Sequence, residues 1–526
     1  MSASDTAVVR NRPDAARSPV ATLRRTVGHP VAVAVGQWAL FVVMSALALK
    51  PVLTTAIVAD DFYVLFYTEQ LGGGSFVKAL EIGMDGASLG HFNYLGQVIG
   101  AMTSWLWIQL SFVHDVRFSV VFAATKLVVY LAVASAAARF CRKALAAGGV
   151  SLSPWRTRIY VAVALFGSLQ IHVPWSNDPT GSYPMAGFAS AAIGFFVLSF
   201  AVDAYVEPSW RRSIGLGIAA CAAVLYYEIN VAVAIALVPV ACMLAFRRDD
   251  EGRRSWRNVL LAGIPLGIPA FVTLVLRLTT QPEPGGFEYS GTTISTDATL
   301  IPSFLKALVS SLPGSAWKLS RDWLAAPIWI RVTPVLLLVL FAVVLGVLAK
   351  LHPYPERARV SRPWLLASLV AAPLIYWVIA TAIQSATPKV RSESLGIGYV
   401  YNYYAIGAVS VAVLVVIAAV VIAPVVRHRG IVLAVLVPVV VAALSVQFLI
   451  SSNVRARLAE VTEPNADLLT AYADRLPIDQ RCDALIIWTN GAWPEYYERG
   501  VVDGLESASE TYRDEPFCDE PIAPPG

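Results

Sequence analysis

The stretch FSVVFAATKLVVYLAVASAAARFCRK, residues 118–143, decides the fold class. Phe118 to Ala138 is apolar enough to cross a hydrocarbon core, which takes about 20 residues of helix. Arg139, Arg142 and Lys143 follow directly. An apolar run that closes on a basic cluster is typical of a membrane helix that exits on the cytoplasmic side.

The same pattern recurs along the 526 residues. Apolar types make up 57% of the chain and charged types 14%, whereas a soluble domain carries about 25% charged residues. This composition excludes an ordinary soluble globular protein and predicts an all-α polytopic membrane protein. The net charge of +4 is small, so we expect membrane lipid and no nucleic acid as a partner.

The basic clusters orient the chain. Residues 1–30 are rich in arginine and form a basic cytoplasmic tail. Val31–Ala59 is too long for a cleaved signal peptide, so we read it as a retained first span. Tyr94–Phe112 is also apolar enough to span, but that would place the Arg139 cluster outside. An interfacial helix on the outer surface, with Trp105 and Trp107, satisfies both observations.

We therefore predict about eleven spans in the plasma (inner) membrane, with the N-terminus cytoplasmic and the C-terminus extracytoplasmic. The transmembrane domain covers 31–450, with a first outer loop at 60–117, and an extracytoplasmic region covers 451–526. A strand expected at Ala484–Trp488 makes that region a small α/β tail. Cys482 and Cys518 flank it, and a disulfide between them is plausible outside the cell. In chain order, the spans are 31–59, 118–138, 159–175, one reaching 210, two short ones between 212 and 247, 259–279, one ending before 357, 363–384, one ending at 427 and one ending near 450.

Polar residues at the span ends are the candidate site residues. A carboxylate inside a span costs roughly 2.5–3.5 kcal/mol, so such groups usually line an interior or a cavity. Asp60 and Asp61 end the first span; they either mark the interface or act as a general base or divalent-cation ligands. Glu228 lies at the outer turn between the fifth and sixth spans, either simply solvated or presented to a site.

The outer loops carry further candidates. Lys389 and Arg391 lie near Tyr403 and can either anchor the chain at the interface or bind an anionic head group. His91 is more typical of a hydrogen-bonded structural residue than of a catalyst. No phosphate loop, hydrolase elbow, zinc motif or dinucleotide-binding pattern occurs in a suitable context, so we expect no nucleotide or redox cofactor.

Four features in this order resemble the GT-C superfamily of membrane glycosyltransferases. The first span ends in the acidic pair Asp60-Asp61, and the interfacial helix opens as Gly90-His91-Phe92-Asn93-Tyr94-Leu95-Gly96, similar to the family's His-x-Pro-Leu-Gly element. Asp115-Val116-Arg117-Phe118-Ser119 is similar to the family's entry into the second span, and the fifth and sixth spans form a short hairpin. His91 is not followed by proline, and the hairpin turn lacks the family's Thr-Lys pair. The likeness covers the first half of the chain in its motifs and the second half in plan only.

This resemblance implies an inverting glycosyltransferase that uses a polyprenyl-phosphate-linked sugar and a glycan or lipid acceptor of the cell envelope at the extracytoplasmic face. Asp60 would be the general base, with Asp61 as its neighbour or as a ligand of a divalent cation. Lys389, Arg391 and Tyr403 would bind the lipid phosphate of the donor. The expected substrate-binding residues are His91, Asn177, Asp178 and Glu228.

Two other classes remain open. A transporter or flippase of an anionic lipid-linked substrate would use Glu228 and the basic loop, and it predicts an internal repeat with broken helices in matching halves. The sequence shows no clear repeat. A structural or assembly protein would use the C-terminal region to bind a partner. The enzyme hypothesis requires Asp60, Glu228 and the Lys389 loop to meet at one outward-facing cavity.

Overall fold

The computed structural model is helical throughout its described regular segments, without a strand among them. The chain divides into two compact units, Met1–Met44 and Ser45–Gly526. The described residues are 30–55, 57, 65, 75–85, 93–114, 116–169, 171, 178, 180–181, 185–247, 255–279, 297–312, 360, 362–392, 402–422, 429–473, 476–489 and 495–519.

Seven helical segments of this described part are long and apolar enough to cross a membrane. They are Val31–Ala48, Phe118–Ala147, Gly187–Val206, Glu228–Ala245, Trp256–Thr279, Pro363–Ser385 and Tyr403–Val421. The chain is therefore an α-helical polytopic membrane protein. The predicted third and fifth spans correspond to the shorter helices α8 (Pro154–Phe166) and α10 (Trp210–Tyr226). The predicted eighth span lies outside the described residues, so the count of eleven stays a prediction.

The first predicted span ends earlier than expected. Helix α2 (Pro30–Ala48) is followed by the short α3 (Lys50–Leu53) rather than continuing to residue 59. Pro51 explains the break, because proline lacks the backbone donor that would continue the helical hydrogen bonds of α2. Within the first unit, Val31 and Val35 are each 61% exposed, as expected of a helix that faces lipid.

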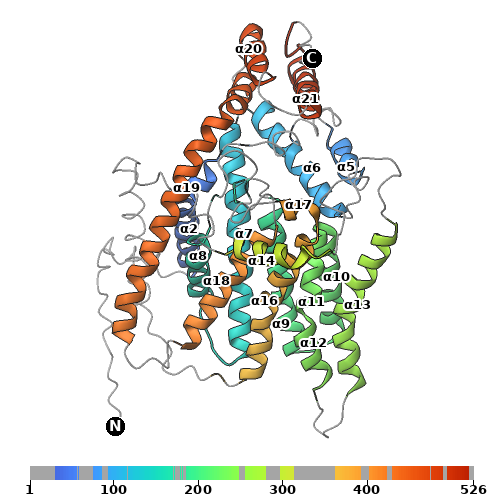
Figure 1. Ribbon diagram of the computed structural model, residues 1–526, viewed down its shortest axis with the longest axis vertical. Helices are drawn as coiled ribbons and strands as arrows, with labels where there is room; N and C mark the ends of the chain where they lie inside the picture. The colour runs from blue at the N-terminus through green and yellow to red at the C-terminus, as the bar shows by residue number, and fades with distance from the viewer. Residues whose placement is uncertain are drawn as a thin grey trace, which may run out of the picture. The chain divides into compact units, whose positions relative to one another are not determined.

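Helix α7 (Phe118–Ala147) is central to the second unit (Figure 1). It packs against α8, α9 (Gly187–Val206) and α18 (Asn402–Ile422). Its 30 residues correspond to about 45 Å of helix, which exceeds a hydrocarbon core of about 30 Å. The basic residues in its last turns therefore have length to reach the membrane surface.

A second group of helices packs beside this centre. Helix α10 contacts α13 (Trp256–Thr279), and α16 (Pro363–Ser385) contacts α11 (Val231–Ala236) and α18. Small residues permit these close approaches. A Cβ at Gly194 of α9 would overlap the hydroxyl of Tyr376 on α16.

The predicted interfacial segment is helical and is not among the seven long apolar helices. It consists of α6 (Tyr94–Ile108) and one π-helical turn, η2 (Gln109–Val113). Helix α5 (Phe76–Asp85) packs against α6, with the rings of Phe76 and Trp105 5.2 Å apart. Its position at a membrane interface stays a prediction.

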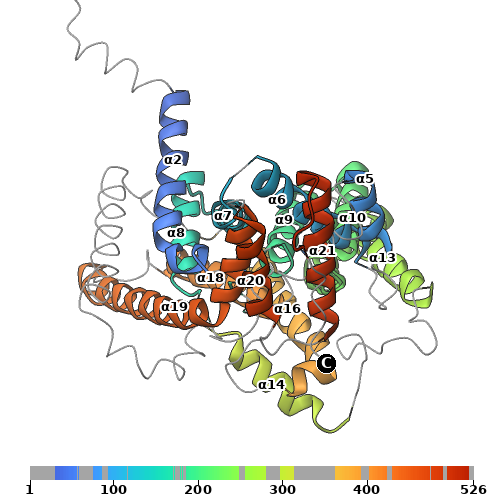
Figure 2. The same cartoon turned by 90° about the horizontal axis from the view of Figure 1, so that it is seen from above.

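The C-terminal region is helical, and the predicted strand is wrong. Helix α19 (Arg429–Ala473) runs without a break through the expected domain boundary at 450/451. Helices α20 (Ile478–Thr489) and α21 (Glu495–Arg513) follow, and both views show them side by side (Figures 1 and 2). Residues 485 and 488 of the apolar run are buried while 486 and 487 are exposed, which is helical periodicity that a five-residue run does not reveal.

Candidate functional site

Lys126 is the most unusual polar residue of the described membrane helices. It lies within the span α7 and its side chain is fully buried. Its Nζ donates to Val52 O at 3.0 Å, to Thr55 O at 3.0 Å and to Thr55 Oγ1 at 2.7 Å. The same ammonium lies 4.2 Å from the centroid of the Phe122 ring. A buried intramembrane cation is costly, so by default it indicates a functional or organising role.

These contacts fix the segment that leads to Asp60 and Asp61. What we call the 52–57 segment, of which residues 52–55 and 57 are described, consists of the last two residues of α3 and the chain that follows them. Thr55 Oγ1 also donates to Val52 O at 2.8 Å, which closes a local turn. Lys126 thus adds a charged donor to Val52 O, which also accepts from the backbone N–H of Thr55 at 3.3 Å, and it binds the carbonyl of Thr55, just after α3.

The turn that contains Asp178, Thr180 and Gly181 meets the same place. Asp178 is buried, and its Oδ1 accepts hydrogen bonds from the backbone N–H groups of Thr180 and Gly181 at 2.8 and 3.0 Å. Gly181 lies against Thr55, whose Oγ1 would be 3.3 Å from a Cβ at position 181. Tyr130 Oη, one helical turn after Lys126, donates to Thr180 O at 2.7 Å. Asp178 therefore stabilises the turn that carries it.

One face of α19 contacts both the 52–57 segment and the chain that precedes the Asp178 turn. Gln447 Nε2 donates to Leu169 O at 3.0 Å, and Ser451 Oγ accepts from the backbone N–H of Ile171 at 3.3 Å. Arg455 Nε donates to Thr54 O at 3.2 Å. Residues 447, 451 and 455 recur every four positions, so they form one stripe of the helix. This stripe contacts the chain just before each predicted acidic site, 60–61 and 177–178.

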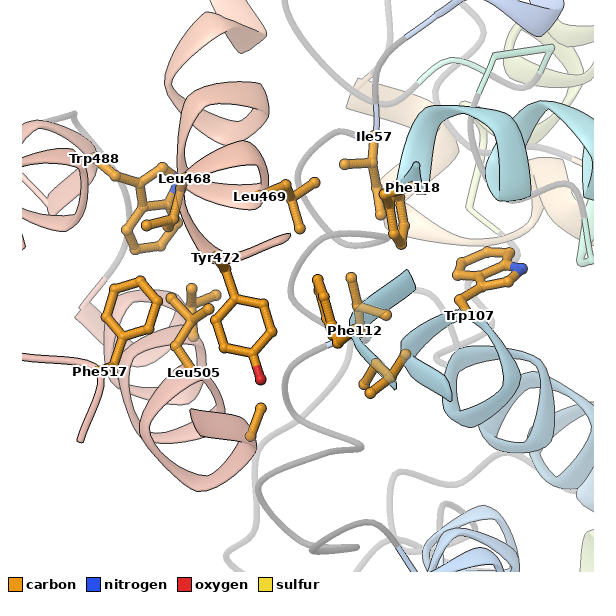
Figure 3. Close-up of a cluster of buried hydrophobic side chains, with 14 of the residues drawn as sticks. Ile57, Trp107, Phe112, Phe118, Leu468, Leu469, Tyr472, Trp488, Leu505 and Phe517 are labelled. Atoms are coloured by element: carbon orange, nitrogen blue, oxygen red, sulfur yellow. The ribbon is translucent and has the colours of Figure 1, made fainter. Parts of the chain in front are cut away.

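Ile57, at the end of the 52–57 segment, shares a buried hydrophobic cluster with residues of α19, α20 and α21 (Figure 3). Asn465 Nδ2 donates to Ile57 O at 3.3 Å, while its Oδ1 accepts from Trp488 Nε1 at 2.6 Å. The rings of Phe112 and Tyr472 meet edge to face at a centroid distance of 4.2 Å. The buried hydrophobic cluster, which we call the C-terminal cluster, consists of Ile57, Leu65, Trp107, Ile108, Phe112, Phe118, Val121, Phe122, Leu468, Leu469, Tyr472, Leu485, Trp488, Val501, Leu505, Ala508 and Phe517.

The hairpin turn between the predicted fifth and sixth spans adjoins the start of α6. A Cβ at Gly96 would overlap the carbonyl oxygen of Tyr226, so only glycine permits this approach. Tyr226 Oη donates to Met185 O, which ties the hairpin to the chain after the Asp178 turn. Glu228 follows in the 3-10 turn η3 (Glu228–Asn230) and is partly buried.

Asn230 connects that hairpin to α9 and α16. Its side chain is fully buried and donates to Ala223 O at 2.9 Å. Its Oδ1 accepts from Tyr376 Oη at 2.6 Å and from Ser190 Oγ at 3.2 Å. Buried amides of this kind need all of their partners, so the network holds η3 in one arrangement against α9 and α16.

The predicted phosphate-binding loop is the short helix α17 (Pro388–Ser392), which follows α16. Arg391 pairs with Asp297 (Nη1 to Oδ2, 2.5 Å) and donates to Thr299 Oγ1 at 3.1 Å. Lys306 of α14 (Leu300–Ser310) donates to Arg391 O at 2.8 Å. Arg391 therefore has a positioning role between α17 and the chain that enters α14.

The remaining predicted residues divide into two groups. Lys389 is partly buried on α17, and Tyr403 is buried, with its backbone N–H donating to Gln384 Oε1 at 3.2 Å. The others lie outside the described residues, and their roles stay predictions. They are Asp60, Asp61, His91 and Asn177.

Sequence reasoning missed Lys126, although a signal was present. It is the one charged residue within 118–138, and such a residue inside a span indicates a function by default. Asn465 offered no comparable signal, because its partner Ile57 lies 408 residues away in sequence.

The remaining predicted features are a disulfide and a metal site. Cys482 and Cys518 form the disulfide predicted from the sequence, with their Cα atoms 5.3 Å apart. Among the described residues, no group of three or more His, Cys, Asp or Glu side chains is arranged to hold a metal ion. The cation suggested for Asp60 and Asp61 falls outside that part of the chain.

Comparison of the chain with models of known families, with curated proteins and with solved structures finds no match.

Proposed function

We propose that the chain is a membrane glycosyltransferase of the GT-C kind, which moves a sugar from a polyprenyl-phosphate donor to a glycan or lipid acceptor at the outer face of the plasma membrane. The observation that carries this proposal is the meeting of Thr55 with Lys126 and Gly181. These contacts bring the chain that leads to Asp60 and Asp61 close to the Asp178 turn, although the two segments are far apart in sequence.

The neighbouring hairpin supports the same proposal. Gly96 of the family-like motif lies against Tyr226, and Tyr226 in turn contacts Met185. Gly96 and the hairpin turn therefore adjoin each other at one end of the second unit. Figure 1 shows α17 at that same end, beyond the C-terminal end of α16. A site built from several loops on a helical scaffold is a common way to bind a substrate.

In the proposed reaction, Asp60 removes the proton of the acceptor hydroxyl. The resulting oxygen attacks the anomeric carbon of the sugar from the face opposite the lipid phosphate. The new glycosidic bond forms as the carbon–phosphate-oxygen bond breaks, and the phosphate leaves with the electron pair and with inversion at carbon. Lys389 would stabilise its developing charge, while Arg391 positions α17. Asp61 would support Asp60 directly or through a divalent cation.

The test uses purified full-length protein in lipid with a synthetic polyprenyl-phosphate sugar and a cell-envelope acceptor extract. Asp60→Asn should lower the transfer rate by about 100-fold or more, because it removes the general base. Asp479→Asn, an exposed acid on α20, is the matched control and should retain the wild-type rate. Full transfer by both Asp60→Ala and Asp61→Ala would overturn the proposal.

A transporter of an anionic lipid-linked substrate is the second candidate, because two observations favour it. Lys126 is an intramembrane cation, and the span Glu228–Ala245 is divided into η3, α11 and α12 (Val238–Ala245). Interrupted helices and buried charges are typical of transporters. Vesicles that contain the protein and a fluorescent polyprenyl phosphate separate the two candidates. Movement of the lipid between leaflets without sugar transfer would favour the transporter.

A further inference from the structure

A cavity lies at the basic end of α7, away from the candidate site. Its volume is about 500 Å³, and α7, the start of α8 and α9 form its walls. Four basic side chains line it, and its lining contains no carboxylate. They are Arg139, Arg142, Lys143 and Arg158.

The cavity is apolar along one side. Ala132, Ala136 and Arg139 recur at helical spacing on α7, so small residues leave room next to the first guanidinium. Phe196 of α9 forms a further wall and is 47% exposed. Val128, one turn before Ala132, is 65% exposed. The apolar side thus continues along the outer surface of a membrane-spanning helix.

The basic side has a defined arrangement. Lys143 forms an ion pair with Asp203 and donates to Ser199 O at 3.3 Å, so its charge is matched by a carboxylate beside the cavity. The guanidinium of Arg139 lies 5.2 Å from the centroid of the Phe196 ring, which holds it at the boundary between the basic and apolar sides. Together with Arg139, Arg142 and Arg158 give the cavity three guanidinium side chains. Their donors match phosphate oxygens in geometry and charge.

We propose that this cavity binds an anionic phospholipid, with the phosphate of the head group between Arg139, Arg142 and Arg158 and an acyl chain along Phe196 and Val128. A basic pocket beside an apolar helix surface fits both the head group and the acyl chain of this ligand. A free phosphate would use the guanidinium groups alone. The positive-inside rule places the Arg139 cluster in the cytoplasmic leaflet, where anionic lipids interact with basic pockets between helices. The site is independent of the glycosyl-transfer proposal.

The experiment measures lipid binding to the full-length protein in detergent by native mass spectrometry and by thermal unfolding. The probes are phosphatidylglycerol, phosphatidylcholine with the same acyl chains, and inorganic phosphate. Phosphatidylglycerol should bind and raise the unfolding temperature. Phosphatidylcholine should bind at least about tenfold more weakly, since its cationic choline opposes the guanidinium groups. Inorganic phosphate alone should give no comparable shift.

Arg139→Gln combined with Arg142→Gln should weaken phosphatidylglycerol binding by about tenfold or more. The matched control combines Arg211→Gln with Arg257→Gln, which removes the same charge from exposed residues outside the cavity lining. It should bind as the wild type does. Equal unfolding temperatures of both double variants in lipid-free detergent show that each is folded. If the cavity variant is less stable, Phe196→Ala, which removes the apolar wall and the ring against Arg139 but keeps all four basic side chains, must still weaken binding. Equal losses in both double variants, equal affinity for the two lipids, or full stabilisation by inorganic phosphate would overturn the proposal.

Discussion

Lys126 Nζ lies 2.7 Å from Thr55 Oγ1, and this contact joins a membrane-spanning helix to the chain that leads into Asp60. Because the same ammonium also binds two backbone carbonyls, it fixes the direction in which the chain leaves α3. The candidate site therefore depends on a cation that belongs to the scaffold.

Replacement of this cation should loosen the 52–57 segment. Lys126→Met removes the donor to three acceptors, and hydrogen bonds to charged groups contribute roughly 1.5–3 kcal/mol each. We expect faster hydrogen exchange of the backbone amides at Thr54 and Thr55, measured by mass spectrometry. The global unfolding temperature need not fall, because an apolar side chain is favoured at that depth. Val120→Ala, at an exposed position on the same helix, should leave exchange unchanged, and equal protection in both variants would contradict the role of Lys126.

Two glycines one turn apart on α6 should respond in opposite ways. Gly96→Ala introduces a Cβ that overlaps the Tyr226 carbonyl, and such overpacking typically costs about 1–3 kcal/mol. Gly100→Ala meets nothing within 4 Å and should be neutral or stabilising by up to about 1 kcal/mol, because alanine favours the helix. Thermal unfolding in detergent measures both. A Gly96→Ala protein as stable as Gly100→Ala would show that α6 does not pack on the hairpin turn.

The hydrogen bond between Trp488 and Asn465 should contribute measurably to the C-terminal cluster. Trp488→Phe keeps an aromatic ring but removes the donor to Asn465 Oδ1 at 2.6 Å, leaving a buried amide short of a partner. We expect a loss of about 1–3 kcal/mol in the free energy of unfolding of this region, measured by chemical denaturation. Ile487→Ala, whose parent side chain is 63% exposed, is the control and should change stability by about 0.5 kcal/mol or less. A similar cost for both variants would contradict a contribution of this hydrogen bond to stability.

The disulfide should restrain the end of the chain. Cys482 and Cys518 close a loop with a sequence separation of 36, and a disulfide of this kind typically contributes roughly 2–4 kcal/mol. Cys482→Ser should therefore make α20 and α21 more sensitive to limited proteolysis. Cys242→Ser, which changes a free and exposed cysteine, should have the wild-type cleavage pattern. Unchanged protection after loss of the disulfide would show that packing alone holds these helices.

The sequence predicted the membrane class and most long helices correctly, since apolar length and basic clusters are local signals. Phe118–Ala138 was recognised in this way, although the helix extends to Ala147. The strand at Ala484–Trp488 was wrong, because five apolar residues do not distinguish periods of 2 and 3.6. Pro51 could have shown the early end of the first helix.

The site was less accessible to sequence reasoning. Asp178 was expected to bind substrate, and that role stays a prediction. Its acceptance of hydrogen bonds from the N–H groups of its own turn depends on backbone geometry, which the sequence does not reveal. The pairing of Arg391 with Asp297 spans 94 residues, and that of Asn465 with Ile57 spans 408. Such long-range contacts leave no periodic pattern in one sequence. The roles of Asp60 and Asp61 stay predictions.

The most direct test of the central claim is quantitative lipid analysis of the purified protein. Wild-type protein and Lys126→Met would be extracted under identical mild conditions and their bound lipids identified by mass spectrometry. We predict that a polyprenyl-phosphate-linked sugar is bound to the wild type and is strongly depleted in Lys126→Met, because the 52–57 segment loses the contacts that fix its position. Absence of any polyprenyl-phosphate species from the wild type, or equal amounts in both proteins, would contradict it.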